Sequence, residues 1–126
     1  MILKKVLVID DDDLSIFLIG MTLEDIAFIE SHESVNSGWE ALHYLNEKDT
    51  TPDLILVDLN MPEMDGYEFI QRFEKDYWQD TPSTQVIVVT SSQRESDKNK
   101  SLSFKSVVGF IQKPISEEKI KGVLGL

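Results

Sequence analysis

Short runs of apolar, mostly β-branched residues recur along this chain and predict its strands. Three runs stand out, at residues 6–9, 54–57 and 86–89, and weaker runs lie at residues 107–111 and 27–29. Continuous apolar runs of this kind are typical of strands that are buried on both faces of a parallel sheet. We therefore expect five strands, with residues 27–29 as the second in chain order.

The segment after the first strand has the spacing of an amphipathic helix, with apolar residues at intervals of three and four. These residues are Leu14, Phe17, Leu18 and Met21, and the stripe is widened by Ile16 and Ile19. Asp13 is placed to cap the start of this helix, and Glu24-Asp25 mark its polar end.

Four more helices are expected between and after the remaining strands. Trp39, Leu42 and Leu45 mark the second, which ends before Thr51-Pro52, and Phe69, Ile70 and Phe73 mark the third. The fourth is expected between Glu95 and Ser106, and the fifth follows the N-cap Ser116. This alternation predicts an α/β fold, with a parallel sheet that is covered by helices on both faces.

Composition limits the class of protein. The 126 residues fit one compact domain, and the absence of cysteine excludes disulfides and thiolate metal sites. The 23 acidic and 12 basic residues give a net charge of −11, which disfavours binding to nucleic acid or anionic lipid. No apolar run is long enough to span a membrane, and the first strand begins too early for a signal peptide. We therefore expect a cytoplasmic protein.

Residues suited to phosphate chemistry follow the predicted strands. Asp10 and Asp11 follow the first, Asp58 the third, Thr90 the fourth and Lys113 the fifth. Parallel strands end at the same edge of a sheet, where open α/β sheets bind ligands, so these side chains are expected to meet. Clustered carboxylates stay ionised beside a cation, and oxygen ligands without His or Cys favour Mg²⁺ or Mn²⁺. Because a carboxylate is also a nucleophile for phosphoryl transfer, the set fits the formation of an aspartyl phosphate.

Several motifs together resemble the receiver domains of two-component response regulators, in particular the single-domain, chemotaxis-type kind. The motifs are Val8-Ile9-Asp10-Asp11, residues 58–66, Val89-Thr90-Ser91 and Lys113-Pro114, and the resemblance covers residues 5–124. It implies a flavodoxin-like, doubly wound (βα)5 fold with strand order 2-1-3-4-5. It also implies a single receiver domain, residues 1–126, with no output domain.

The resemblance implies roles for the acidic residues. Asp58 is expected to accept the phosphoryl group. Asp10, Asp11, Asp58 and the backbone carbonyl of Asn60 are expected to hold Mg²⁺ or Mn²⁺. The Asn60 side chain would also tune the lifetime of the phosphoryl group.

Further roles are implied for residues of the last two strands and their loops. Thr90 and Lys113 would contact the phosphoryl group, and Thr90 and Phe110 would act as the switch. Ser91 and Ser92 would tune the lifetime of the phosphoryl group. The bond between Lys113 and the following proline is expected to be cis, as is usual in this family.

The same resemblance implies the partners. The donor would be a sensor histidine kinase or a histidine phosphotransfer protein. The face formed by the fourth helix, fifth strand and fifth helix would change its affinity for a downstream protein. The protein would act as a monomer or a phosphorylation-dependent dimer, and its only catalysis would be its own phosphorylation and dephosphorylation.

Some residue assignments have alternatives. The run of four aspartates permits either Asp10-Asp11 or Asp11-Asp12 as the metal pair. Asp10-Asp11 is favoured, because the first residues past the strand face the crevice. Asp12 is otherwise expected to be solvated. Phe110 fits a buried core position nearly as well as a switch, and Gly66 is expected to adopt a positive φ in a turn.

Other functions compete with this interpretation. A phosphatase of the haloacid dehalogenase type has an Asp-x-Asp-x-Thr or Val motif, whereas Leu14 follows the four aspartates here. No Gly-x-x-x-x-Gly-Lys loop supports nucleotide binding, and Ser15 and Met21 replace the Gly and Glu of a calcium loop. A phosphorylation-independent interaction module on the same fold is the third alternative.

Overall fold

The computed structural model describes residues 2–47 and 51–126, in which strands and helices alternate along the chain. The strands are β1 (Val6–Ile9), β2 (His32–Val35), β3 (Leu54–Val57), β4 (Gln85–Thr90) and β5 (Val107–Gln112). The helices are α1 (Asp13–Glu24), α2 (Gly38–Glu47), α3 (Gly66–Phe73), α4 (Glu95–Leu102) and α5 (Glu117–Leu124). A π-helical turn, η1 (Glu74–Trp78), continues α3.

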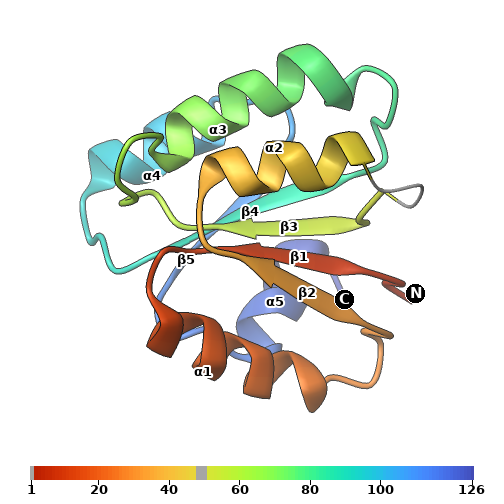
Figure 1. Ribbon diagram of the computed structural model, residues 1–126. Helices are drawn as coiled ribbons and strands as arrows, with labels where there is room; N and C mark the ends of the chain where they lie inside the picture. The colour runs from red at the N-terminus through yellow and green to blue at the C-terminus, as the bar shows by residue number, and fades with distance from the viewer. Residues whose placement is uncertain (1, 48–50) are drawn as a thin grey trace.

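All strand pairs are parallel, and the sheet order is β2-β1-β3-β4-β5. Helices α1 and α5 cover one face of the sheet, and α2, α3 and α4 cover the other (Figure 1). The predicted doubly wound α/β fold and its strand order are confirmed. In this order β1 and β3 lie side by side at the centre, so the residues that follow them emerge next to each other.

Side chains of the central strands alternate between the two faces of the sheet, and each face has its own apolar core. One core contains Leu7, Ile9, Ile55 and Val57 with Phe69, Ile70 and Phe73 of α3. The other contains Val6, Val8, Leu54 and Leu56 with Ile19 and Leu23 of α1 and Ile120 of α5. Two apolar faces explain why these strands are continuous apolar runs in the sequence.

The second strand lies at His32–Val35, so the prediction of a strand at residues 27–29 is wrong. As the edge strand, β2 pairs only with β1, and its residues Glu33 and Ser34 are exposed. Because β2 is partly exposed, it lacks the apolar run that marks the central strands. Ile29 is buried and forms an isolated bridge with Leu3, so Ile29 and the half-buried Phe28 pack on the core beside the sheet, whereas Ala27 is exposed.

The first helix was found where expected, but of the predicted stripe only Ile19 is buried in the core. Leu14 and Phe17 are each 63% exposed, and Leu18 and Met21 are each 52% exposed. The buried residues of α1 are Ile19 and Leu23. Because α1 is apolar on more than one side, the spacing predicts the helix but does not decide which side the sheet covers.

The cap of α1 is shifted by one residue from the prediction. The Asp12 side chain accepts a hydrogen bond from the backbone N–H of Leu14, at 3.1 Å, and Asp13 is the first helical residue. The Asp12 backbone N–H in turn donates to Oδ1 of Asp10, at 3.0 Å. Asp12 is exposed to solvent, as predicted, but it is Asp12 and not Asp13 whose side chain satisfies the helix terminus.

The remaining helices were found in the predicted segments. The predicted end of the second helix, before Thr51-Pro52, falls on residues 48–50, which lie outside the described residues. Ser116 caps α5 by accepting from the backbone N–H of Lys119, at 3.1 Å. No described helix combines the length and the apolar character that crossing a membrane requires.

Candidate functional site

Three aspartates meet where β1 and β3 end. Asp10 follows β1 and Asp58 follows β3, and the Asp58 backbone N–H donates to the carbonyl of Ile9, at 3.0 Å. Each of Asp10, Asp11 and Asp58 has a carboxylate oxygen within 4.8 Å of the others. Asp10 and Asp58 are 1% and 8% exposed, whereas Asp11 faces solvent. The strand register therefore gathers acidic residues from distant parts of the sequence at one edge.

Lys113, after β5, provides the positive charge beside these carboxylates. Its Nζ lies 2.8 Å from Asp10 Oδ2 and 3.5 Å from Asp58 Oδ2. The Lys113 backbone N–H donates to the carbonyl of Thr90, at 2.8 Å, which joins the ends of β4 and β5. The peptide bond between Lys113 and Pro114 is cis, as predicted.

The charges of this cluster do not balance. Burial raises the pKa of Asp58 above its ordinary value, the Lys113 charge opposes this, and the Asp10 charge adds to it. Burial lowers the pKa of Lys113, but its hydrogen bond to Asp10 and the charges of Asp58 and Asp10 outweigh burial and raise it. Three carboxylates around one ammonium group leave two negative charges without compensation. An all-oxygen site with this excess charge fits a hard divalent cation.

Gly66, the first residue of α3, fixes the backbone behind Asp58. A Cβ atom at this position would lie 2.5 Å from the Asp58 carbonyl oxygen, and the Gly66 N–H donates to the Leu59 carbonyl at 2.9 Å. The predicted positive φ at Gly66 is wrong, since the residue with positive φ in this turn is Glu63, at 65°. Glycine is needed here because two backbone segments approach closely.

The other predicted site residues surround the cluster at different depths. Thr90 is fully buried and its Oγ1 accepts from the Ser92 N–H at 3.3 Å, while Ser91 is exposed. The Asn60 N–H approaches Asp58 Oδ1 at 3.5 Å, the limit of a hydrogen bond. Phe110 is half-buried on β5 and lines a hollow of about 270 Å³ beside the start of α4.

Two residues near this site were not found from the sequence. The Tyr67 hydroxyl on α3 donates to Asp97 Oδ1 on α4 at 2.6 Å, and the Ser92 hydroxyl donates to Asp97 Oδ2 at 2.5 Å. Neither Tyr67 nor Asp97 belongs to a motif, and they lie 30 residues apart. Their proximity depends on the packing of two helices, which no local pattern shows.

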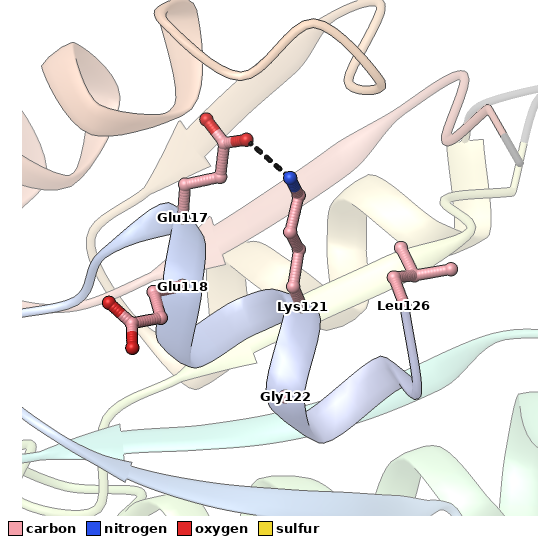
Figure 2. Close-up of a pocket in the computed structure, with 5 residues that line it drawn as sticks. All are labelled: Glu117, Glu118, Lys121, Gly122 and Leu126. Atoms are coloured by element: carbon pink, nitrogen blue, oxygen red, sulfur yellow. Dashed lines mark ion pairs between the residues drawn. The ribbon is translucent and has the colours of Figure 1, made fainter.

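A second hollow lies on α5. It is lined by Glu117, Glu118, Lys121, Gly122 and Leu126, with an ion pair of 3.0 Å between Glu117 and Lys121 (Figure 2). None of the acidic cluster residues lines it, and its exposed i, i+4 ion pair stabilises the helix only slightly. We therefore place the candidate site at the carboxyl ends of β1 and β3.

Comparison with known proteins agrees with this geometry. The family model for the response regulator receiver domain matches residues 6–124. The chain belongs to this family. A receiver domain is a signalling module of two-component systems, which fits the acidic cluster at the sheet edge.

Individual relatives extend the comparison. Over 120 residues the chain is 33% identical to the signal transduction histidine-protein kinase BarA of Escherichia coli (strain K12), covering 94% of this chain and 12% of BarA. The chain thus spans about an eighth of that relative. The two component response regulator of Cytophaga hutchinsonii has a TM-score of 0.91 and 28% identity, covering 99% of this chain and 96% of its own. The phosphorylated cyanobacterial phytochrome response regulator RcpA has a TM-score of 0.76 and 29% identity, covering 97% and 89%.

Proposed function

We propose that this receiver domain is a phosphorylation-controlled signalling switch in which Asp58 accepts a phosphoryl group from a phosphohistidine. The observation that carries the proposal is the buried Asp58 carboxylate between Asp10, Asp11 and Lys113. The similar regulator RcpA is itself phosphorylated, which supports this role. The donor is a sensor histidine kinase or a histidine phosphotransfer protein, because both present a phosphorylated imidazole.

In the proposed reaction, a carboxylate oxygen of Asp58 attacks the phosphorus atom and the bond between phosphorus and the imidazole nitrogen breaks. That nitrogen keeps the electron pair of the bond and takes up a proton, and Asp58 becomes an acyl phosphate. Phosphoryl transfer depends on positioning and on positive charge more than on acid–base help. The Lys113 ammonium and the Thr90 hydroxyl serve these needs by contacting phosphoryl oxygens. The domain catalyses no turnover beyond its own phosphorylation and dephosphorylation.

The excess negative charge of the cluster supports a role for a divalent cation. Asp10, Asp11, Asp58 and the backbone carbonyl of Asn60 would hold Mg²⁺ or Mn²⁺. The ion supplies positive charge that lets carboxylates and phosphoryl oxygens approach one another. Without it, the Lys113 ammonium would face both the Asp58 carboxylate and the incoming phosphoryl group alone.

Phosphorylation is proposed to act through the groups around Thr90. The phosphoryl group carries a charge of roughly −2 at neutral pH in place of the single charge of the carboxylate, and this charge attracts the hydroxyl of Thr90 toward Asp58. Movement of the loop after β4 lets the half-buried Phe110 ring turn inward and changes the α4-β5-α5 face that a downstream protein binds. Asn60, Ser91 and Ser92, which lie on loops at this edge, tune the lifetime of the phosphoryl group.

The exposed face of α1 is the proposed docking surface for the phosphohistidine donor. Phe17 and Leu18 expose apolar side chains one to two turns after the Asp12 cap, and Leu18 also lines a hollow with Lys113 and Pro114. The apolar surface therefore continues to the edge where Asp58 lies. Contiguous exposed apolar residues mark interaction sites, and a protein that covers these residues can bring a histidine to the crevice.

The test is phosphorylation by acetyl phosphate in the presence of Mg²⁺, followed by intact mass spectrometry. We expect one labile phosphoryl adduct on the wild-type protein and none on Asp58→Asn. Asp76→Asn, which makes the same change at an exposed aspartate of η1, is the matched control and should react like the wild type.

Two other results separate the alternatives. Steady release of phosphate from simple phosphate esters, without an adduct, would indicate a phosphatase. No adduct with any small phosphodonor would indicate an interaction module that works without phosphorylation.

A further inference from the structure

Helix α4 has little apolar anchorage. Its sequence, residues 95–102, contains one large apolar residue, Leu102, which is 43% exposed, and its only buried residue is Ser101. Its N-cap residue, Arg94, provides no side-chain hydrogen bond to the helix terminus. A helix without a buried apolar face depends on other tertiary contacts for its position.

Polar contacts of Asp97 provide that anchorage. One oxygen of its carboxylate accepts from Tyr67 Oη at 2.6 Å and the other accepts from Ser92 Oγ at 2.5 Å. The Tyr67 ring lies under Lys100, whose Nζ is 4.2 Å from the ring centroid, and stacks on Phe104 at 6.3 Å. Tyr67 therefore holds α4 against α3 by its hydroxyl and by its ring.

The same contacts lead from Asp97 to the phosphorylation site. Ser92 Oγ accepts from the Arg94 N–H at 3.2 Å, and the Ser92 N–H donates to Thr90 Oγ1 at 3.3 Å. Thr90 Oγ1 is thus linked to the Asp97 carboxylate through one residue, Ser92. Movement of the Thr90 hydroxyl toward Asp58 has to stretch or break this link.

The protonation states of these groups favour the contacts. Hydrogen bonds from Ser92 and Tyr67 lower the pKa of Asp97 below its ordinary value. Burial, followed by the hydrogen bond to Asp97, raises the pKa of Tyr67 to about 12. At neutral pH the carboxylate is therefore charged and the phenol keeps the proton that it donates. Hydrogen bonds to a charged acceptor are stronger than those between neutral groups.

We infer that Ser92, Asp97 and Tyr67 form a latch that holds α4 and the Thr90 loop in the unphosphorylated arrangement. The inference rests on the proposed function and adds positioning residues to it. Phosphorylation of Asp58 opens the latch by drawing the Thr90 hydroxyl away from Ser92. Because coupling between sites is reciprocal, opening the latch by mutation must strengthen binding of a phosphoryl group or its analogue at Asp58.

The test measures the affinity of the protein for beryllofluoride, a phosphoryl analogue, at saturating Mg²⁺. We expect Tyr67→Phe and Asp97→Asn each to bind it about fivefold more tightly than the wild type, which is the lower end of typical coupling. Tyr67→Phe keeps the stacked ring and removes only the hydroxyl. The double variant should gain less than the product of the two effects, because both remove one shared hydrogen bond.

Matched controls test whether the effect belongs to the latch. Tyr77→Phe removes a hydroxyl that donates to the Leu42 carbonyl, away from α4, and Glu95→Gln removes a charge from the first turn of α4. Both should bind beryllofluoride like the wild type. Amide hydrogen exchange of residues 95–102 adds a direct measurement. Exchange should become faster on beryllofluoride binding in the wild type and should already be fast in free Tyr67→Phe.

The outcomes distinguish the latch from the function on which it rests. A wild-type protein that takes up neither beryllofluoride nor phosphoryl groups contradicts the proposed function and the latch together. Normal uptake by the wild type, with equal affinities in Tyr67→Phe and Tyr77→Phe, contradicts the latch alone. If Asp97→Asn proves unstable in thermal unfolding, Tyr67→Phe decides the result by itself.

Discussion

Helices α1 and α3 have similar apolar spacing but bury different amounts of it. In α3, Phe69, Ile70 and Phe73 are fully buried between the helix and the sheet. In α1, most of the corresponding stripe is exposed, with Phe17 at 63%, and the helix packs on the sheet through Ile19 and Leu23. Both helices begin close to the acidic cluster, one after Asp12 and the other after Asp65.

This difference separates apolar residues that stabilise the fold from apolar residues available for binding. Helix α1 is held on the sheet by a covered apolar face, which it has in addition to its exposed residues. Exposed residues of the stripe add nothing to the core, and they lie beside the proposed phosphorylation site. The comparison therefore assigns stability to the α3 stripe and supports the proposal that the exposed residues of α1 serve recognition.

The largest expected effect is on stability. Phe69→Ala should lower the free energy of unfolding by about 4 kcal/mol, because it leaves a cavity in the core. Phe17→Ala should change it by less than about 0.5 kcal/mol, because the ring is mostly exposed. Urea denaturation followed by circular dichroism measures both values. Equal losses in the two variants would contradict the comparison.

The second prediction concerns recognition by the phosphohistidine donor. Phe17→Ala should slow phosphotransfer from a cognate histidine kinase about thirtyfold, the effect of losing an interface residue that contributes about 2 kcal/mol. Its reaction with acetyl phosphate should be unchanged, because this small donor does not contact α1. Radiolabel transfer from the phosphorylated kinase measures the first rate, and intact mass spectrometry measures the second.

Trp39→Ala is the control for that experiment. Trp39 is an aromatic residue of α2 that is 49% exposed, and it does not belong to the α1 stripe. It should receive phosphoryl groups from the kinase at the wild-type rate. Slower transfer in Trp39→Ala than in Phe17→Ala would place the donor on α2 instead.

The sequence predicted the fold wherever burial and polarity were uniform along an element. Strands β1 and β3 lie at the centre of the sheet, so every residue is apolar and the run is unmistakable. The edge strand β2 is half polar, and the nearby run at residues 27–29 was more apolar than the strand itself. A local pattern reports how apolar a segment is, while strand pairing decides which segment joins the sheet.

For the candidate site, the positions after the strands were predictable because parallel strands share one edge. Asp10, Asp58 and Lys113 were expected to meet, and the structure brings them together. The contact between Tyr67 and Asp97 was not predictable, because it depends on how two helices pack. Gly66 was assigned the wrong role. A glycine is needed both where φ is positive and where two backbone segments approach closely, and the sequence alone does not tell these two causes apart.

The smallest expected effect is a gain in stability. It concerns the acidic cluster, close to which α1 and α3 begin. Without Mg²⁺, Asp58→Asn should raise the free energy of unfolding by about 1–2 kcal/mol at neutral pH, since it removes a buried charge that is incompletely paired. The control Asp76→Asn removes an exposed charge and should change it by less than about 0.5 kcal/mol. A destabilised Asp58→Asn would mean that Lys113 compensates Asp58 fully.

The pH dependence of this difference gives a sharper test. The folded state raises the pKa of Asp58, so it binds that proton more tightly than the unfolded chain does. The cost in stability of keeping Asp58 ionised in the folded wild type is therefore full above the raised pKa. It is lost as the pH falls to the ordinary pKa of an aspartate. The stability difference between Asp58→Asn and the wild type should shrink over that acidic range. Adding Mg²⁺ at neutral pH should reverse the sign of the difference, because an ion bound by the wild-type carboxylates at 100 times its Kd contributes about 2.7 kcal/mol to the wild type. If the stability difference instead grows on acidification, the folded state stabilises Asp58 as an anion. The buried charge would then not be a cost to the fold.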